Sequence, residues 1–285
     1  MVHDTMILCQ LQTLVKEDPG LAQSYVGDLV RQAAADGADM VCLPEMFACP
    51  YESKNFPPRA EEKGGPTWQF LSSLAAECGI YLSAGSVPEK EVLQTESGQE
   101  KILIYNTAYV FDREGKQIAK HRKVHLFDID VTGGQSFRES DTLTPGDHFT
   151  VFETEFGLMG LCICFDIRFV ETLRLMALKG ARMVLVPAAF NMTTGPAHWE
   201  LNLRSQAMLN QLYIAATSDA RDMTASYHAW GHSLLADPWG AVVSQLDERE
   251  GRLMTKVDLS RVEEIRRQLP ILSARRTDLY ELKEK

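Results

Sequence analysis

The sequence predicts an α/β protein, and three observations lead to this fold class. Apolar segments that suit buried strands alternate with amphipathic segments that suit helices along the whole chain. Of the 285 residues, 45% are hydrophobic and 24% are charged, which is the composition of an ordinary globular protein. The chain also divides into two broadly similar halves, which suggests two sheets packed face to face with helices outside.

The first half opens with a helix signal. Asp18 is followed by Pro19 at the first helical position, and apolar residues then recur every four positions until Gly37 ends the helix. The pattern then predicts a strand at residues 38–43, a helix at 66–78, strands at 80–87 and 102–111 joined by a polar hairpin at 88–101, and a strand at 116–120.

A long polar loop, residues 131–148, separates the two halves, and no linker or internal repeat divides the chain. We therefore expect one domain over residues 1–285, with a C-terminal tail from about residue 270 at the surface or at a subunit contact. The second half is predicted to contain strands at 158–163, 183–186, 212–217, 229–236, 241–246 and 253–257, and helices at 167–179 and 197–210.

Charge and cysteine content exclude several functions. The chain has 29 basic and 39 acidic residues, a net charge of −10, which argues against nucleic-acid binding. Six cysteines are too few for a disulfide scaffold, and their spacing does not fit a zinc site. No apolar segment approaches the roughly 18 residues of a membrane helix, and residues 1–4 do not resemble a secretory signal. We expect a cytoplasmic protein without metal, cofactor, nucleic-acid or membrane partner.

Three reactive residues follow predicted strands. Glu45 follows the strand at residues 38–43, Lys123 follows the strand at 116–120, and Cys164 follows the strand at 158–163, just before a helix that Asp166 could cap. In open α/β sheets, ligands bind beyond the carboxyl ends of the strands. Each residue alone could be a loop acid, a surface lysine or a core cysteine. Together they supply the base, electrophilic stabiliser and nucleophile of amide hydrolysis through a covalent intermediate.

The proposed chemistry needs an activated thiol. A free thiol is only a few per cent thiolate at neutral pH, so we expect the charge of Lys123 and the N-terminus of the following helix to favour the thiolate of Cys164. The backbone N–H of Phe165 and the Lys123 ammonium could hold the oxyanion, and a well-placed donor contributes about 3–4 kcal/mol. Glu45 would accept the thiol proton, pass it to the leaving ammonia and then activate water.

Three segments resemble the signature segments of the nitrilase superfamily, the carbon–nitrogen hydrolases. They are residues 43–47 (LPEMF), 121–127 (HRKVHLF) and 162–169 (CICFDIRF), with 78 residues from Glu45 to Lys123 and 41 from there to Cys164. The resemblance extends over nearly the whole chain. It implies a four-layer α-β-β-α sandwich that forms a homodimer through a helical face, and an amidase with a Glu-Lys-Cys triad and a cysteine thioester intermediate.

Other segments are similar to the omega-amidase branch, above all residues 190–200 (FNMTTGPAHWE) and 226–233 (SYHAWGHS). This resemblance implies hydrolysis of the terminal amide of short 2-oxo dicarboxylic acid monoamides, namely 2-oxoglutaramate and 2-oxosuccinamate. Two alternatives stay open. One is deaminated glutathione amidase, which shares the GPAHWE portion. The other is a catalytically inactive interaction module, against which the intact Glu45, Lys123 and Cys164 argue.

The resemblance also suggests residues around the triad. Glu139 matches a second acid that positions the lysine and the substrate, and Phe165 replaces the tyrosine that more commonly follows the nucleophile. The sequence does not decide whether Arg168 or Arg221 binds the substrate carboxylate. The expected substrate-binding residues are Tyr51, Phe165, Arg168, Asn191 and Thr194.

Overall fold

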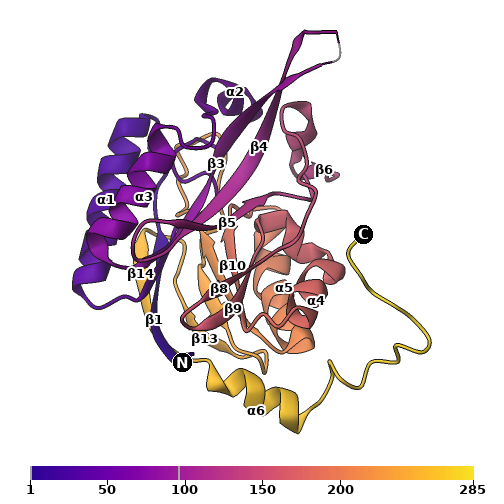
Figure 1. The fold of residues 1–285 in the computed structure, drawn as a ribbon. Coiled ribbons are helices and arrows are strands. Elements are labelled where there is room, and N and C mark those ends of the chain that lie inside the picture. Colours follow the sequence, from indigo (N-terminus) through magenta and orange to yellow (C-terminus); the bar gives the residue numbers. More distant parts are fainter. Residues whose placement is uncertain (1, 96) are drawn as a thin grey trace.

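The computed structural model describes residues 2–95 and 97–285, and two six-stranded sheets form its centre (Figure 1). The first sheet has the strand order β14-β1-β2-β3-β4-β5, and the second has the order β13-β12-β11-β10-β9-β8. The first-sheet strands are β1 (Thr5–Gln12), β2 (Met40–Cys42), β3 (Tyr81–Gln94), β4 (Glu100–Phe111), β5 (Gln117–Arg122) and β14 (Gly251–Asp258). The second-sheet strands are β8 (Thr150–Thr154), β9 (Gly157–Leu161), β10 (Met183–Ala188), β11 (Tyr213–Ser218), β12 (Leu234–Ala236) and β13 (Val242–Gln245).

Helices cover the outer faces of both sheets. The helices α1 (Pro19–Ala35) and α3 (Pro66–Cys78) pack on the first sheet, and α4 (Val170–Leu178) and α5 (Gly195–Asn210) pack on the second (Figure 1). A short helix α2 (Phe56–Arg59) follows the loop after β2, and α6 (Ser260–Gln268) follows β14. These layers form the predicted α-β-β-α sandwich.

The side-chain alternation of β1 shows how the layers are held together. Met6 and Leu8 are buried in the core between the sheets, whereas Cys9 and Leu11 are buried in a second core beneath α1 and α3. Successive strand residues point to opposite faces, so one strand contributes to both cores. At the start of α1, the Asp18 carboxylate accepts the N–H of Leu21 at 2.8 Å, as its sequence signal predicts.

Several elements differ from the sequence prediction. The strand expected at residues 229–236 covers only Leu234–Ala236, because Gly231 and His232 have positive φ angles, which interrupt an extended strand. The helix expected from residue 167 begins at Val170, after a 3₁₀ turn over Cys164–Arg168. The loop expected at residues 131–148 contains β7 (Ser136–Arg138), which pairs with β6 (Asp128–Asp130) just before the loop in a two-stranded ribbon. Residue 96, in the predicted hairpin, lies outside the described residues.

The C-terminal tail runs over the surface. Residues 270–285 form turns and extended chain that is mostly exposed, and the Glu284 carboxylate accepts the N–H of Phe149 at 3.1 Å. In the part of the chain that the structure describes, no helix combines the length and the apolar character needed to span a membrane.

Candidate active site

The basic residues in β5 and directly after it lie in two different environments. His121 and Lys123 face the interior and are buried, whereas Lys120 and Arg122 point outward and pair with Glu89. This division follows from the two-residue period of a strand. The lysine expected to act in catalysis is therefore the one that enters the core.

The Glu45 loop is anchored by a bulge in β3. Gly85 has a φ of +62°, and a Cβ at this position would lie 2.1 Å from the carbonyl oxygen of Pro44, so only glycine fits. The next residue, Ser86, donates its N–H to the same carbonyl at 3.2 Å, and its Oγ accepts the N–H of Met46 at 3.0 Å. These contacts hold both neighbours of Glu45.

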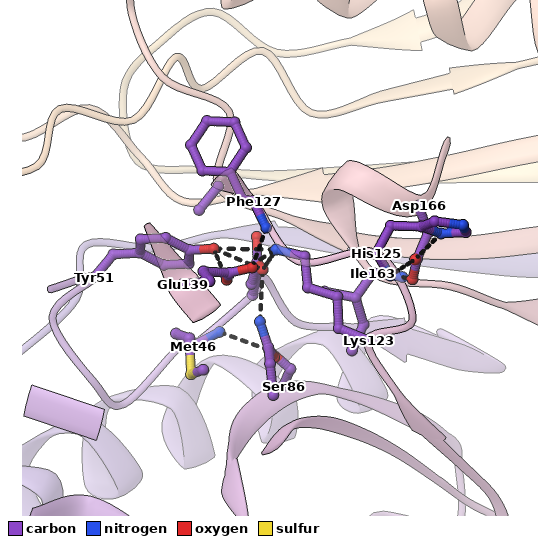
Figure 2. Close-up of polar contacts among 12 residues, drawn as sticks. Met46, Tyr51, Ser86, Lys123, His125, Phe127, Glu139, Ile163 and Asp166 are labelled. Carbon is purple, nitrogen blue, oxygen red and sulfur yellow. Dashed lines mark hydrogen bonds and ion pairs between the residues drawn. The ribbon is translucent and has the colours of Figure 1, made fainter. Parts of the chain in front are cut away.

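The Lys123 ammonium lies between two carboxylates (Figure 2). Its Nζ is 2.9 Å from Glu45 Oε1, 3.0 Å from Glu139 Oε1 and 3.2 Å from the Oη of Tyr51. Burial alone would lower the pKa of Lys123, but the negative charges of Glu139 and Glu45 outweigh burial and hold this pKa above its usual value. The lysine is therefore a cation with all three of its protons directed at acceptors.

Both oxygens of Glu139 are occupied. The Oε1 atom accepts from Lys123 and from the Oη of Tyr51 at 2.5 Å, and the Oε2 atom accepts the backbone N–H of Phe127 at 2.6 Å. Such a carboxylate is well suited to hold the lysine in place. It has little capacity left to accept a further proton from a reacting group.

Glu45 differs because one of its oxygens is free. Its Oε1 accepts from Lys123, from the Nδ2 of Asn106 at 2.7 Å and from the Oη of Tyr51 at 3.1 Å, but its buried Oε2 has no hydrogen-bond partner among the described residues. Burial, together with the negative charge of Glu139, raises the pKa of Glu45 even though Lys123 opposes this shift. A carboxylate with a raised pKa and a free oxygen is suited to general base catalysis.

Cys164 begins the 3₁₀ turn after β9, with only 5% of its surface exposed and a φ of 46°. The charges of Glu45 and Lys123 both act on its thiol. Burial and the charge of Glu45 raise the pKa of the Cys164 thiol well above its usual value, although Lys123 acts in the opposite direction. This direction is opposite to the expectation that Lys123 and the N-terminus of the following helix would favour the thiolate of Cys164.

The prediction that Asp166 caps the helix after the nucleophile is wrong. The residue before α4 is Phe169, which makes no side-chain capping bond. Asp166 lies inside the preceding turn, where its carboxylate accepts the N–H of Ile163 at 3.0 Å. Helix α4 therefore begins at Val170, six residues after Cys164, and its N-terminus is not at the cysteine as expected.

Comparison with known proteins decides the family. The profile of the family described as carbon-nitrogen hydrolase matches residues 8–267. The chain belongs to this family. The omega-amidase NIT2 of Xenopus tropicalis is 49% identical over 257 residues, or 90% of each chain, and that of Homo sapiens is 45% identical over 96% of this chain and 95% of the relative.

A solved structure supports the same assignment. Nit3 of Saccharomyces cerevisiae, a member of branch 10 of the nitrilase superfamily, superposes with a TM-score of 0.85 and 35% identity. The superposition covers 96% of this chain and 98% of Nit3. The predicted family, sandwich fold and class of enzyme, a hydrolase of carbon–nitrogen bonds in amides, are confirmed.

Aromatic side chains form a wall beside the triad of this carbon–nitrogen hydrolase. The ring centroid of Tyr51 lies 4.8 Å from that of Tyr227, and the rings of Phe127 and Phe165 are 5.2 Å apart. The hydroxyl of Tyr51 is part of the carboxylate cluster. Phe165 places an apolar ring, rather than a second hydroxyl, next to the nucleophile.

The remaining predicted binding residues gather around Phe190. The guanidinium of Arg168 lies 4.6 Å from the Phe190 ring centroid, and the Oδ1 of Asn191 accepts the N–H and Oγ1 of Thr194 at 2.8 and 3.0 Å. The Nε of Arg168 and the Nδ2 of Asn191 are buried and have no partner in residues 2–95 and 97–285. Arg221 instead donates to the carbonyls of Ala229 and Trp230, which suits a structural role.

Two cavities of about 310 Å³ each border the loop that carries Tyr227. One is lined in part by Tyr51, Tyr227 and Asp219. The other is open, and Thr193 and His228 contribute to its wall. It lies between the two segments that resemble the omega-amidase branch.

Sequence reasoning missed three contributors to the site. Asn106 is a fully buried polar residue within β4, and a polar side chain at an inward position of a strand is a signal that could have indicated it. Ala189 acts through its backbone, which leaves no signal in the sequence. Tyr227 donates its hydroxyl to the carbonyl of Ala189 at 2.5 Å, and only its place in a resembling segment indicated it.

Proposed function

We propose that this carbon–nitrogen hydrolase is an omega-amidase that converts 2-oxoglutaramate and 2-oxosuccinamate into the 2-oxo acid and ammonia through a thioester on Cys164. One observation carries the proposal. The ammonium of Lys123 is held between Glu45 and Glu139, and Glu45, whose charge acts on the Cys164 thiol, keeps one buried oxygen without a hydrogen-bond partner among the described residues. The relatives of 45–49% identity that bear the name omega-amidase support the substrate class.

Acylation begins from the neutral thiol. Glu45 Oε2 takes the proton of Cys164 as the sulfur attacks the amide carbon, so that an S–C bond forms and the carbonyl oxygen becomes an oxyanion. The tetrahedral intermediate then collapses. Its C–N bond breaks, Glu45 returns the proton to the nitrogen, and ammonia leaves a thioester on Cys164.

Hydrolysis of the thioester uses the same base in the same position. Glu45 takes a proton from water, and the hydroxyl oxygen attacks the thioester carbon. The C–S bond breaks, the 2-oxo acid leaves, and the proton on Glu45 returns to the sulfur of Cys164. The thiol and the carboxylate are thereby restored, and the two half-reactions together consume only the amide and water.

The oxyanion has two donors available in this scheme. Lys123 Nζ contacts Tyr51 Oη at 3.2 Å, the longest of its three contacts, and can exchange this acceptor for the oxyanion. The N–H of Phe165 follows the nucleophile directly. Donors placed in this way stabilise the transition state by about 3–4 kcal/mol each.

In this proposal the distal carboxylate of the substrate binds to Arg168 and Asn191, beside Phe190. Arg168 Nε and Asn191 Nδ2 are buried donors without protein partners, and such donors are costly unless a ligand satisfies them. Burial also lowers the pKa of Arg168, so a carboxylate beside it would offset the cost of its buried charge. Substrate would enter through the open cavity lined by Thr193 and His228.

Assembly and location belong to the same proposal, which describes a cytoplasmic homodimer. The outer helical layer of the second sheet exposes apolar side chains that suit burial against a second subunit. They are Val170 and Leu178 on α4 and Leu201, Met208 and Leu209 on α5. Sedimentation at micromolar concentration should give about twice the chain mass, since two-fold dimers are the commonest assemblies. A monomer would contradict this part.

Ammonia release over a panel of amides tests the function. We expect kcat/KM for butyramide, which lacks the distal carboxylate, to fall at least about tenfold below that for 2-oxoglutaramate, or about 1.4 kcal/mol. Cys164→Ala should abolish turnover, whereas Cys162→Ala, which removes an equally buried thiol two residues earlier, should remain active.

Three outcomes would contradict the proposal. Equal kcat/KM for butyramide and 2-oxoglutaramate would exclude recognition of the distal carboxylate. Efficient hydrolysis of deaminated glutathione alone would assign a different substrate. Turnover that survives Cys164→Ala would exclude the thioester.

A further inference from the structure

A second buried carboxylate network lies beside the triad and takes no part in the steps above. Asp166 is fully buried, and its two oxygens accept four hydrogen bonds; Figure 2 labels His125 and Ile163 beside it. Its Oδ1 lies 2.8 Å from both the backbone N and the Nδ1 of His125. Its Oδ2 lies 3.0 Å from the backbone N of Ile163 and 3.0 Å from the Nε2 of His121.

These partners belong to the two segments that carry the triad. His121 and His125 lie two residues before and two residues after Lys123, and Ile163 directly precedes Cys164. The first segment leaves β5 of the first sheet, and the second leaves β9 of the second sheet. One carboxylate therefore bonds across the interface between the sheets, at the level of the reacting groups.

The backbone at the nucleophile needs such support. Cys164 has a φ of 46°, and a non-glycine residue in this region costs about 1–3 kcal/mol unless its surroundings hold it there. Burial would raise the pKa of Asp166, but hydrogen bonds from His121 and His125 outweigh burial and keep this pKa below its usual value. The acceptor is thus a charged carboxylate, which forms stronger hydrogen bonds than a neutral group.

We propose that Asp166 is a positioning residue that sets the placement of Cys164 relative to Lys123 and Glu45 by tying the nucleophile turn to His121 and His125. This inference rests on the proposed thiol chemistry. Asp166 does not touch the substrate. It acts by holding the sulfur and the ammonium, which come from different sheets, at a separation that permits attack.

The exchange Asp166→Asn tests this role with little change in volume. An amide nitrogen at this position would face N–H donors of His125, His121 or Ile163, so at least one hydrogen bond would be replaced by a donor–donor contact. We expect kcat for 2-oxoglutaramate to fall about 10–100-fold, because small misplacements of reacting groups have effects of this size. KM should stay within about twofold, since the distal carboxylate site is unchanged.

Asp237→Asn is the matched control. Asp237 is also buried and accepts the N–H groups of Trp239 and Ala241, both at 2.9 Å, but it lies in the turn between β12 and β13. Its exchange should lower the melting temperature without lowering kcat. If both variants lose stability alike and neither loses kcat, Asp166 is only structural and the proposal is wrong.

If Asp166→Asn does not fold, a second variant and a second measurement still test the proposal. His125→Ala removes one side-chain donor and leaves the backbone N–H in place, and we expect kcat to fall about threefold to tenfold. The rate at which iodoacetamide alkylates Cys164, followed by peptide mass spectrometry against pH, should change in both variants and not in Asp237→Asn. This readout needs no substrate, so it is independent of the substrate assignment. Unchanged kcat and alkylation in His125→Ala would overturn the proposal.

Discussion

Glu45 and Glu139 are two buried glutamates that lie almost equally close to one lysine, yet their surroundings differ. The Nζ of Lys123 is 2.9 Å from Glu45 and 3.0 Å from Glu139, and both side chains are fully buried. Glu139 comes from the turn after β7 and has a partner for each oxygen. Glu45 comes from the loop after β2 and has one oxygen without a partner among the described residues.

This difference teaches how two identical side chains receive different roles. Charge, burial and distance from Lys123 do not separate them. The distribution of accepted hydrogen bonds over the two oxygens does. Each carboxylate accepts three, but those of Glu45 all fall on Oε1, so its Oε2 can take a proton without first breaking a hydrogen bond. Glu45 is therefore our candidate for the base, and Glu139 for the residue that holds Lys123.

The largest expected effect comes from Glu45→Gln. The amide cannot accept the thiol proton, and loss of general base catalysis lowers kcat by about 10²–10⁴-fold. Glu89→Gln is the matched control, since Glu89 is also buried and paired with Lys120 and Arg122, but on the outer side of the sheet. Ammonia release gives kcat for both variants. If Glu45→Gln keeps activity within about tenfold of the wild type, the comparison fails.

Glu139→Gln should have an intermediate effect. The amide retains the size of the side chain but loses the charge that holds Lys123, so we expect kcat to fall about 10–100-fold through misplacement of the ammonium. Single-turnover measurements of ammonia release would detect the loss in the chemical step. A loss equal to or larger than that of Glu45→Gln would reverse the two assigned roles.

Removing one hydroxyl should have a smaller effect. In Tyr51→Phe, Glu139 loses a donor at 2.5 Å and Lys123 loses its third acceptor, while the ring remains to pack on Tyr227. We expect kcat to fall about threefold to tenfold, the worth of a hydrogen bond to a charged group. Tyr105→Phe, which removes a tyrosine hydroxyl from the outer face, is the control. An unchanged kcat in Tyr51→Phe would show that this hydroxyl does not support the cluster.

The finest test is the pH profile of kcat/KM. Glu45 must be ionised to act as a base, and burial and the charge of Glu139 raise its pKa above 4.5. Activity should therefore be lost as pH falls through a value above 4.5, where an ordinary glutamate would still be ionised. Glu139→Gln removes one of the causes of the raised pKa, so the acidic limb of its profile should move to lower pH. A limb that moves to higher pH would contradict this account.

Much of the fold and the triad could be predicted from sequence because strands that run in one direction expose their carboxyl ends at one edge. Glu45, Lys123 and Cys164 each follow a strand, and the structure brings the first two into direct contact and the third within the influence of both charges. Strand β1 was missed because buried glutamines interrupt its apolar pattern. The Nε2 of Gln10 donates to the carbonyl of Ala216 in the other sheet, a partner that no local pattern reveals.

The properties that depend on packing could not be predicted. The thiol of Cys164 was expected to ionise because a lysine lies nearby, but the extent of its burial, and therefore the sign of its pKa shift, is set by residues from the whole chain. Asp166 was assigned to a helix cap because it follows the nucleophile by two residues. Its histidine partners, His121 and His125, lie 45 and 41 residues earlier, the first in β5 of the other sheet and the second in the loop after β5.

The burial of Cys164 has a consequence for the chemical durability of the protein. Peroxides and other electrophiles attack thiolates, and susceptibility to oxidation follows thiolate character and exposure. A thiol that is 5% exposed and has a raised pKa is a poor target for both. In the proposed mechanism Glu45 removes the thiol proton only as the sulfur attacks an amide carbon, so no free thiolate is needed beforehand. Burial should therefore make oxidation of Cys164 to a sulfenic acid slower than that of an exposed cysteine.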